Sequence, residues 1–282
     1  MIYTNLFVRK FSRAERKLIF ALIAVRGQKF FTHSKMDQRK KRALKGLLIL
    51  LMSFIALCII YGYPHIFFLR PQSVHTWRQT DGASLMLNYY HDGLNFFQPR
   101  LHHQEGTNGK TVAEFPITYY LGAVACKIFG FKEGFTRVVS LLFFLLGIIG
   151  MYGIVFLYTQ SLFYSICIAL FLFASPVEAY YAFNFLPDST ATGAMLMGTL
   201  FLLTWHKYGQ KYLLIPFVIF FGIAGMIKIT ALYPLLAYLA TGVTLLIQNG
   251  SKLLNFCKKI KNFIYRFNVF KFLFFKKFFK GF

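Results

Sequence analysis

Residues 138–158 read VVSLLFFLLGIIGMYGIVFLY, an uncharged apolar run long enough to cross a lipid bilayer as one helix. At about 1.5 Å per residue such a helix extends about 30 Å, the thickness of the hydrocarbon core. Further apolar runs occupy residues 47–69, 162–182, 189–205, 213–227 and 229–247. The pattern predicts an all-α integral membrane protein with about six transmembrane helices.

The composition supports this prediction. Hydrophobic residues make up 57% of the 282 residues and aromatic residues 20%, which is more than a soluble domain carries. The net charge of +23 would suit a nucleic-acid partner, but the Lys and Arg residues are bunched between the apolar runs, as they are in the flanks of membrane spans. We therefore expect membrane lipid as a partner, and no nucleic acid.

The positive charges also set the predicted topology. Segment 1–46 holds 13 Lys and Arg residues, and segment 249–282 is basic and aromatic; cytoplasmic flanks are enriched in such residues. Both segments can lie on the cytoplasmic side of a bacterial plasma membrane only if the number of spans between them is even. The shorter run 115–129 is therefore expected to lie along the outer interface as a juxtamembrane helix. The transmembrane domain becomes 47–248, with a long first external loop at 70–137.

The sequence also gives rise to predictions about the two ends of the chain. Met36 opens a basic lead into the first span and is the expected start of translation. The tail 249–282 alternates Lys with Phe and Ile, which suits an interfacial segment attracted to anionic lipid. It equally suits the low-complexity end of a truncated gene.

Most carboxylates fall on the predicted outer face, and two of them are candidates for chemistry. Asp81 follows Arg78 by three residues, and on a helix the two would share one side. A carboxylate near a cation stays ionised and can accept a proton or bind a metal. The alternative is that Asp81 caps a helix over 83–90 and that Asp188 caps the fourth span. An acidic side chain at a membrane boundary costs free energy unless it has a function or an ion-pair partner. This favours a functional role for Asp81 and Asp188 over helix capping.

Cations near these acids are candidates for phosphate binding. Lys228 would emerge at the outer end of the fifth span, where it either extends its charged end to water or binds a lipid phosphate. Arg100 in the external loop is a weaker candidate. The sequence contains no GxGxxG, Walker, HExxH or GxSxG pattern, so nucleotide-driven, metalloprotease and serine-hydrolase functions have no motif support.

Three stretches resemble the GT-C superfamily of polyprenyl-phosphate-sugar-dependent glycosyltransferases, in particular its protein mannosyltransferase and lipid A aminoarabinose transferase branch. They are HTWRQTDGASLMLNYYHDGLNFFQPR at 75–100, EFPITYYLGAVACKIFG at 114–130 and FLPDSTA at 185–191. The resemblance implies a GT-C-like fold and transfer of a sugar from a polyprenyl-phosphate-linked donor to a lipid, glycan or protein acceptor. Relatives continue through more spans, so the resemblance also implies a truncated chain.

The resemblance suggests roles for single residues. Asp81 is expected to be the catalytic base, and Asp81 and Asp188 could together hold a divalent cation, Mg²⁺ or Mn²⁺. Glu114 stands where many relatives carry a cation. The expected substrate-binding residues are Arg78, Arg100, Glu114, Asp188 and Lys228.

Two other functions compete with sugar transfer. A non-catalytic truncated remnant or scaffold would fit the short chain. A transporter or lipid flippase would need charged residues midway across the spans, whereas most charges here fall at predicted span ends.

Overall fold

The computed structural model describes residues 38–102, 109 and 114–248. Predictions about most of the basic segment 1–46, including Met36, and about the tail 249–282 lie outside these residues. The chain divides into two compact units, residues 1–51 and 52–282. The described part of the first unit belongs to a helix, Gln38–Ile60, which continues into the second unit.

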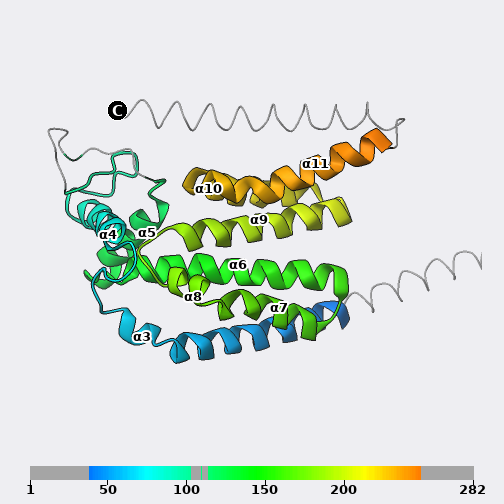
Figure 1. The fold of residues 1–282 in the computed structure, drawn as a ribbon, viewed down its shortest axis with the longest axis horizontal. Helices are drawn as coiled ribbons and strands as arrows, with labels where there is room; N and C mark the ends of the chain where they lie inside the picture. Colours follow the sequence, from blue (N-terminus) through cyan, green and yellow to red (C-terminus); the bar gives the residue numbers. More distant parts are fainter. Residues whose placement is uncertain (1–37, 103–108, 110–113, 249–282) are drawn as a thin grey trace, which may run out of the picture. The chain divides into compact units, whose positions relative to one another are not determined.

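The described residues of the second unit are mostly helical, and the longest connection between helices is residues 92–116 (Figure 1). In chain order they are α3 (Tyr63–Ile66), α4 (Thr76–His91), α5 (Ile117–Phe129), α6 (Phe135–Thr159), α7 (Leu162–Ala174), α8 (Pro176–Ala182), α9 (Asp188–Tyr208), η1 (Lys211–Leu213), α10 (Leu214–Ile227), η2 (Ile229–Leu232) and α11 (Tyr233–Gln248). Every predicted apolar run is therefore largely helical.

The lengths and composition of these helices indicate a membrane protein. Two helices, Gln38–Ile60 and α6, are long and apolar enough to cross a membrane, and the bent pair α7 and α8 makes a third if it is one span. The segments 117–129, 211–227 and 229–245 are shorter apolar helices. The all-helical architecture is confirmed for the described residues, whereas the number of six spans stays a prediction.

Two of the predicted spans are interrupted. The run 162–182 forms two helices, α7 and α8, at 76° to each other, because Pro176 lacks an amide N–H and excludes helical backbone at Ser175, whose ψ is 123°. The run 47–69 is broken between Ile60 and α3, where Gly62 takes a φ of +71°, a conformation that glycine adopts readily. Each of these apolar runs is therefore divided into two helices.

Helix α9 packs between α6 and α10 (Figure 1). Glycines allow a very close approach to α6: a Cβ placed on Gly147 would lie 2.7 Å from the Cα of Gly193. Small residues at such a crossing let two backbones touch and gain dispersion contacts. The close packing buries Phe144, Ile148 and Ala194 completely and fixes where α9 begins.

We expect Gly193→Val to lower the thermal unfolding midpoint of the detergent-purified protein by about 5 °C or more, because overpacking costs about 1–3 kcal/mol. The added side chain would meet the main chain of α6 at Phe143. Gly222→Val on α10 is the matched control, since a Cβ there meets nothing within 4 Å. Equal midpoints for the two variants would contradict the close crossing.

Helices α4 and α5 lie together at one end of α6, α9 and α10 (Figure 1). They fall inside the predicted external loop, and α5 nearly coincides with the predicted interfacial run 115–129. Leu85, Met86 and Tyr89 of α4 pack on Tyr119 and Ala123 of α5. The pair is thus held as a unit at the helix ends, and its depth in a membrane stays a prediction.

The connection into this end is also fixed. The guanidinium of Arg137, in the first turn of α6, donates hydrogen bonds of 2.5 Å to the carbonyl oxygens of Ile66 and Leu69 and one of 3.2 Å to that of Arg70. Ile66 ends α3, and Leu69 and Arg70 follow it in the chain. Arg137 therefore ties the segment that leads into α4 to the start of α6.

Candidate active site

The start of α9 is positioned by a buried turn. Phe185 and Leu186 are fully buried, and the N–H of Phe185 donates to the side chain of Asn184 at 2.7 Å. Asp188 is the first helical residue after Pro187. The turn therefore presents Asp188 at the end of the helices where α4 and α5 lie.

Neither predicted helix cap is present. Pro187, not Asp188, occupies the N-cap position of α9, and no side chain bonds the first turn there. Asp81 lies within α4, which begins at Thr76 instead of near residue 83. The capping interpretation of both acids was wrong, so their carboxylates are available for other contacts.

Asp188 is the centre of a chain of ion pairs that we call the charge network, formed by Arg78, Glu114, Asp188 and Lys228. Oδ1 of Asp188 pairs with Nζ of Lys228, and Oδ2 lies 3.7 Å from Nη2 of Arg78. The same Nη2 pairs with Oε1 of Glu114. The structure thus brings together four of the five residues expected to bind substrate.

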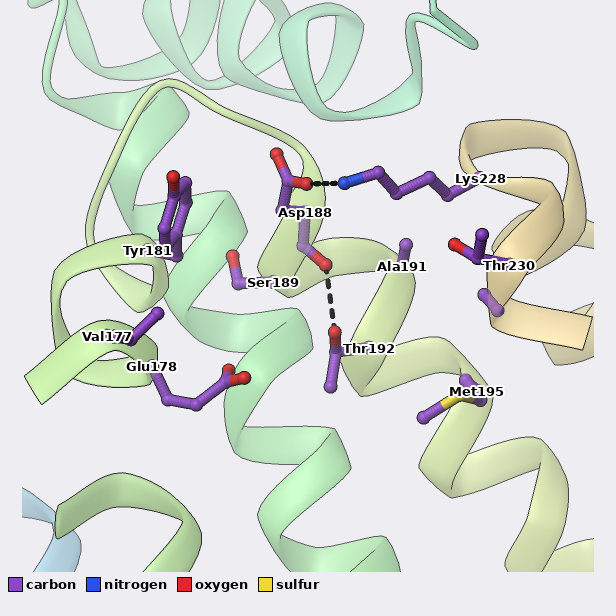
Figure 2. A pocket seen from close by; sticks show the side chains of 11 residues that line it. Val177, Glu178, Tyr181, Asp188, Ser189, Ala191, Thr192, Met195, Lys228 and Thr230 are labelled. Atoms are coloured by element: carbon purple, nitrogen blue, oxygen red, sulfur yellow. Dashed lines mark hydrogen bonds and ion pairs between the residues drawn. The ribbon is translucent and has the colours of Figure 1, made fainter. Parts of the chain in front are cut away.

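Each member of the charge network comes from a different element. Arg78 lies on α4, Glu114 precedes α5, and Asp188 opens α9. Lys228 sits at the break between α10 and η2, where the backbone is extended with φ −146° and ψ 120°. This break turns the Lys228 side chain toward α9 (Figure 2).

The charge network contains two cations and two carboxylates, and its charges also affect the pKa of a neighbouring tyrosine. Although burial lowers the pKa of Arg78, the Glu114 and Asp188 carboxylates raise it further, so its pKa is above the ordinary value. Burial and then the charge of Glu114 raise the pKa of the buried Tyr119 hydroxyl, and Asp188 and Asp81 act in the same direction. Asp81 is therefore within electrostatic reach of the tyrosine that the network surrounds.

A cavity of about 400 Å³ opens beside Asp188 and Lys228 (Figure 2). It lies between α8, α9 and the break after α10, and Val177, Ala191, Met195 and Ala231 supply its apolar surface. Its polar lining consists of Glu178, Tyr181, Asp188, Ser189, Thr192, Lys228 and Thr230. A concave site with a few convergent polar groups is the usual form of a small-molecule site.

Two buried oxygens at this cavity have no hydrogen-bond partner among the described residues: Oγ of Ser189 and Oδ2 of Asp188. Ser189 is only 1% exposed. Thr192, by contrast, donates to the main-chain carbonyl of Asp188 at 3.1 Å (Figure 2). Buried polar atoms are nearly always satisfied in folded proteins; Oδ2 of Asp188 has its ion pair with Arg78, so Oγ of Ser189 is the atom that points to a polar ligand at this cavity.

The other predicted residues lie apart from the cavity. Arg100 pairs with Asp92 at 3.7 Å beside a separate hollow of about 50 Å³. Asp81 lies on α4 one turn after Arg78, and its carboxylate has no ion pair or hydrogen bond within the described residues. Arg100 is thus separate from the charge network, whereas Asp81 is close to it and uncommitted.

The donor set does not fit the expected divalent cation. Within residues 38–102, 109 and 114–248 there is no group of three or more His, Cys, Asp or Glu side chains that could hold a metal ion. Asp188 already contacts Lys228 and Arg78, and these positive charges oppose a second cation at the same carboxylate. We therefore derive no step that uses a metal at Asp81 and Asp188.

Sequence reasoning missed five polar residues of the cavity: Glu178, Tyr181, Ser189, Thr192 and Thr230. No role was predicted for Glu178 from the sequence. Ser175-Pro176 is a typical helix start, and it was the signal that could have placed Glu178 and Tyr181 on a separate short helix.

Residues 113–270 match the family model described as dolichyl-phosphate-mannose-protein mannosyltransferase. No curated protein and no solved structure matches the chain. The matched segment covers more than half of the 282 residues and contains Glu114, Asp188 and Lys228, whereas Arg78 and Asp81 precede it. The resemblance seen in the sequence is confirmed: the chain belongs to the dolichyl-phosphate-mannose-protein mannosyltransferase family.

Proposed function

We propose that this protein transfers a sugar from a polyprenyl-phosphate-linked donor to a hydroxyl group of a protein, glycan or lipid at the outer face of a bacterial plasma membrane. Its family supports the reaction class, a membrane glycosyltransferase with such a donor. The observation that carries the site is the convergence of Arg78, Asp188 and Lys228 from three elements beside a polar cavity.

The proposed orientation puts the charge network outside. Lys207 lies in the last turn of α9 and Lys211 begins η1, at the opposite end of α9 from Asp188, and positive residues favour the cytoplasmic side. With six spans, α4 and α5 would then rest at the outer interface. The donor's lipid chain could approach the cavity from the bilayer while the acceptor comes from the external side.

Lys228 and Arg78 are the proposed phosphate-binding groups. The Lys228 side chain is 48% exposed and that of Arg78 30%, so both retain surface for a ligand beyond their contacts with Asp188. Charge-assisted hydrogen bonds to phosphate oxygens are among the stronger polar contacts in proteins. In the reaction these cations would stabilise the negative charge that grows on the departing phosphate.

Asp81 is the proposed base. Carboxylate oxygens of Asp188 and Glu114 are occupied by cations, whereas Asp81 has no such partner among the described residues, so its oxygens are open to a hydroxyl group. The acceptor hydroxyl would give its proton to Asp81 while its oxygen bonds to the anomeric carbon. The bond from that carbon to the phosphate oxygen breaks, and the electron pair leaves with the phosphate, so that the configuration inverts.

The direct test measures transfer in membranes that carry the protein. Radiolabelled mannose is supplied either on a short-chain polyprenyl phosphate or on a nucleotide diphosphate, with endogenous acceptors present. We expect label on acceptors only with the polyprenyl donor and only with the protein. No transfer from polyprenyl-linked mannose, glucose or galactose would favour the non-catalytic scaffold, and movement of the intact donor across the bilayer would favour the flippase.

A further inference from the structure

We propose that the cavity beside the charge network holds the sugar ring of the donor, with the Glu178 carboxylate accepting hydrogen bonds from two neighbouring ring hydroxyls. The donor would then be a sugar with a free vicinal diol on the side away from its phosphate. This inference rests on the proposed function, because it presumes that the phosphate is held by Lys228 and Arg78.

The cavity has two chemically different walls. Lys228 reaches in from the break after α10, and Glu178 reaches in from α8 on the other side, with Asp188, Ser189 and Thr192 of α9 between them (Figure 2). A sugar phosphate has the matching polarity, since its anionic group sits at one end and its hydroxyls at the other. The bound ring would therefore point from Lys228 toward Glu178.

Glu178 is free to act on a ligand. It lines the cavity and has no hydrogen bond or ion pair within the part of the chain that the structure describes. The cations nearest to it in the network are already balanced, because Arg78 and Lys228 face Glu114 and Asp188. A carboxylate accepts hydrogen bonds at both oxygens, which suits two adjacent hydroxyls.

Ser189 supplies the independent observation that a ligand belongs here. Its side chain is 99% buried, its Oγ has no partner among the described residues, and it lines the same cavity as Glu178. Leaving a buried hydroxyl unsatisfied is costly. A ring hydroxyl would satisfy Oγ, which both donates and accepts.

The size and the remaining lining agree with a sugar ring. The cavity volume of about 400 Å³ lies within the range of small-ligand sites, about 300–1,000 Å³. Met195 and Ala231 give apolar surface for the C–H groups of a ring, and the hydroxyls of Thr192 and Thr230 add neutral polar contacts.

The first experiment measures binding, which does not require turnover. Dissociation constants of the purified protein are compared for a short-chain polyprenyl phosphate with and without attached mannose, glucose or galactose. For the wild type we expect at least one sugar to tighten binding about tenfold, consistent with hydrogen bonds to a charged group. Glu178→Gln and Ser189→Ala should lose most of this gain and bind the bare polyprenyl phosphate as the wild type does.

Glu133→Gln is the matched control, because Glu133 is an acid at the same end of the helices that does not line the cavity. This variant should keep the full increase in affinity that the attached sugar gives the wild type. The inference is overturned if Glu178→Gln still binds the sugar-carrying donor more tightly than the bare polyprenyl phosphate. It is also overturned if none of the three sugars tightens binding to the wild type. Tighter wild-type binding of an amino sugar than of its parent sugar overturns the diol assignment.

A second measurement protects the inference against variants that fail to fold. Monodeoxy forms of the best-binding donor are tested on the wild type, and removal of either of two adjacent hydroxyls should weaken binding about tenfold. Equal binding of all monodeoxy forms overturns the inference. If an attached sugar tightens binding but no sugar is transferred, the proposed function is refuted while the sugar subsite stands. Failure of the proposed function and failure of this inference are therefore distinguishable.

Discussion

Replacement of Asp81 with Asn should lower the rate of sugar transfer by about 100-fold or more, because a positioned base contributes roughly 10²–10⁴ to such a reaction. Asn keeps the size and polarity of the side chain but cannot take the proton of the acceptor. Asp81 has no ion pair or hydrogen bond among the described residues, so the change should not disturb the fold. The measurement is single-turnover transfer from a saturating polyprenyl-phosphate donor.

Asp92→Asn is the control for Asp81. Asp92 lies near the end of the same helix but pairs with Arg100, away from the charge network. We expect it to keep wild-type transfer and both variants to insert and bind donor normally. Transfer by Asp81→Asn within a few-fold of wild type would remove Asp81 from the mechanism and direct attention to Glu178, an acid of the cavity that has no ion pair among the described residues.

Replacement of Lys228 with Met should lower kcat by about 100-fold, the loss typical of removing one group that stabilises transition-state charge. The Met side chain fills similar space but cannot offset the charge on the phosphate. Because the same cation also holds the bound donor, KM for the donor should rise. Lys211→Met, at the opposite end of α9 and exposed, should have no effect on either constant.

A double variant separates a phosphate contact from simple neutralisation of Asp188. If Lys228 only compensates Asp188, then adding Asp188→Asn to Lys228→Met should restore transfer. We expect no restoration, since the double variant still lacks the cation for the phosphate. Recovery to within a few-fold of wild type would show that Lys228 acts through Asp188 alone.

The positions of the helices could largely be predicted from the sequence. Apolar runs such as 138–158 exceed the lengths usual for soluble helices and coincide with α6 to within a few residues. The apolar run 189–205 likewise falls within α9, which follows Pro187 and ends before Gly209. These signals are local, and local signals determine where a helix begins and ends.

The arrangement of the site could not be predicted from the sequence and is known only from the folded structure. Lys228 and Asp188 are 40 residues apart, and Arg78 and Glu114 are 36 apart, so no periodicity connects them. The sequence suggested that all four mattered but not that they were partners. Glu178 and Ser189 escaped notice because the first depends on the bend at Pro176 and the second is an ordinary small residue until its burial is known.

The charge network has a consequence for how this protein changes over generations. Two positive and two negative side chains, contributed by four segments distant in sequence, cancel one another. A mutation that removes one of them leaves an imbalance that a second mutation elsewhere in the gene must repair. Among descendants of a common ancestor, the residue types at positions 78, 114, 188 and 228 should therefore be inherited as correlated combinations rather than drift independently.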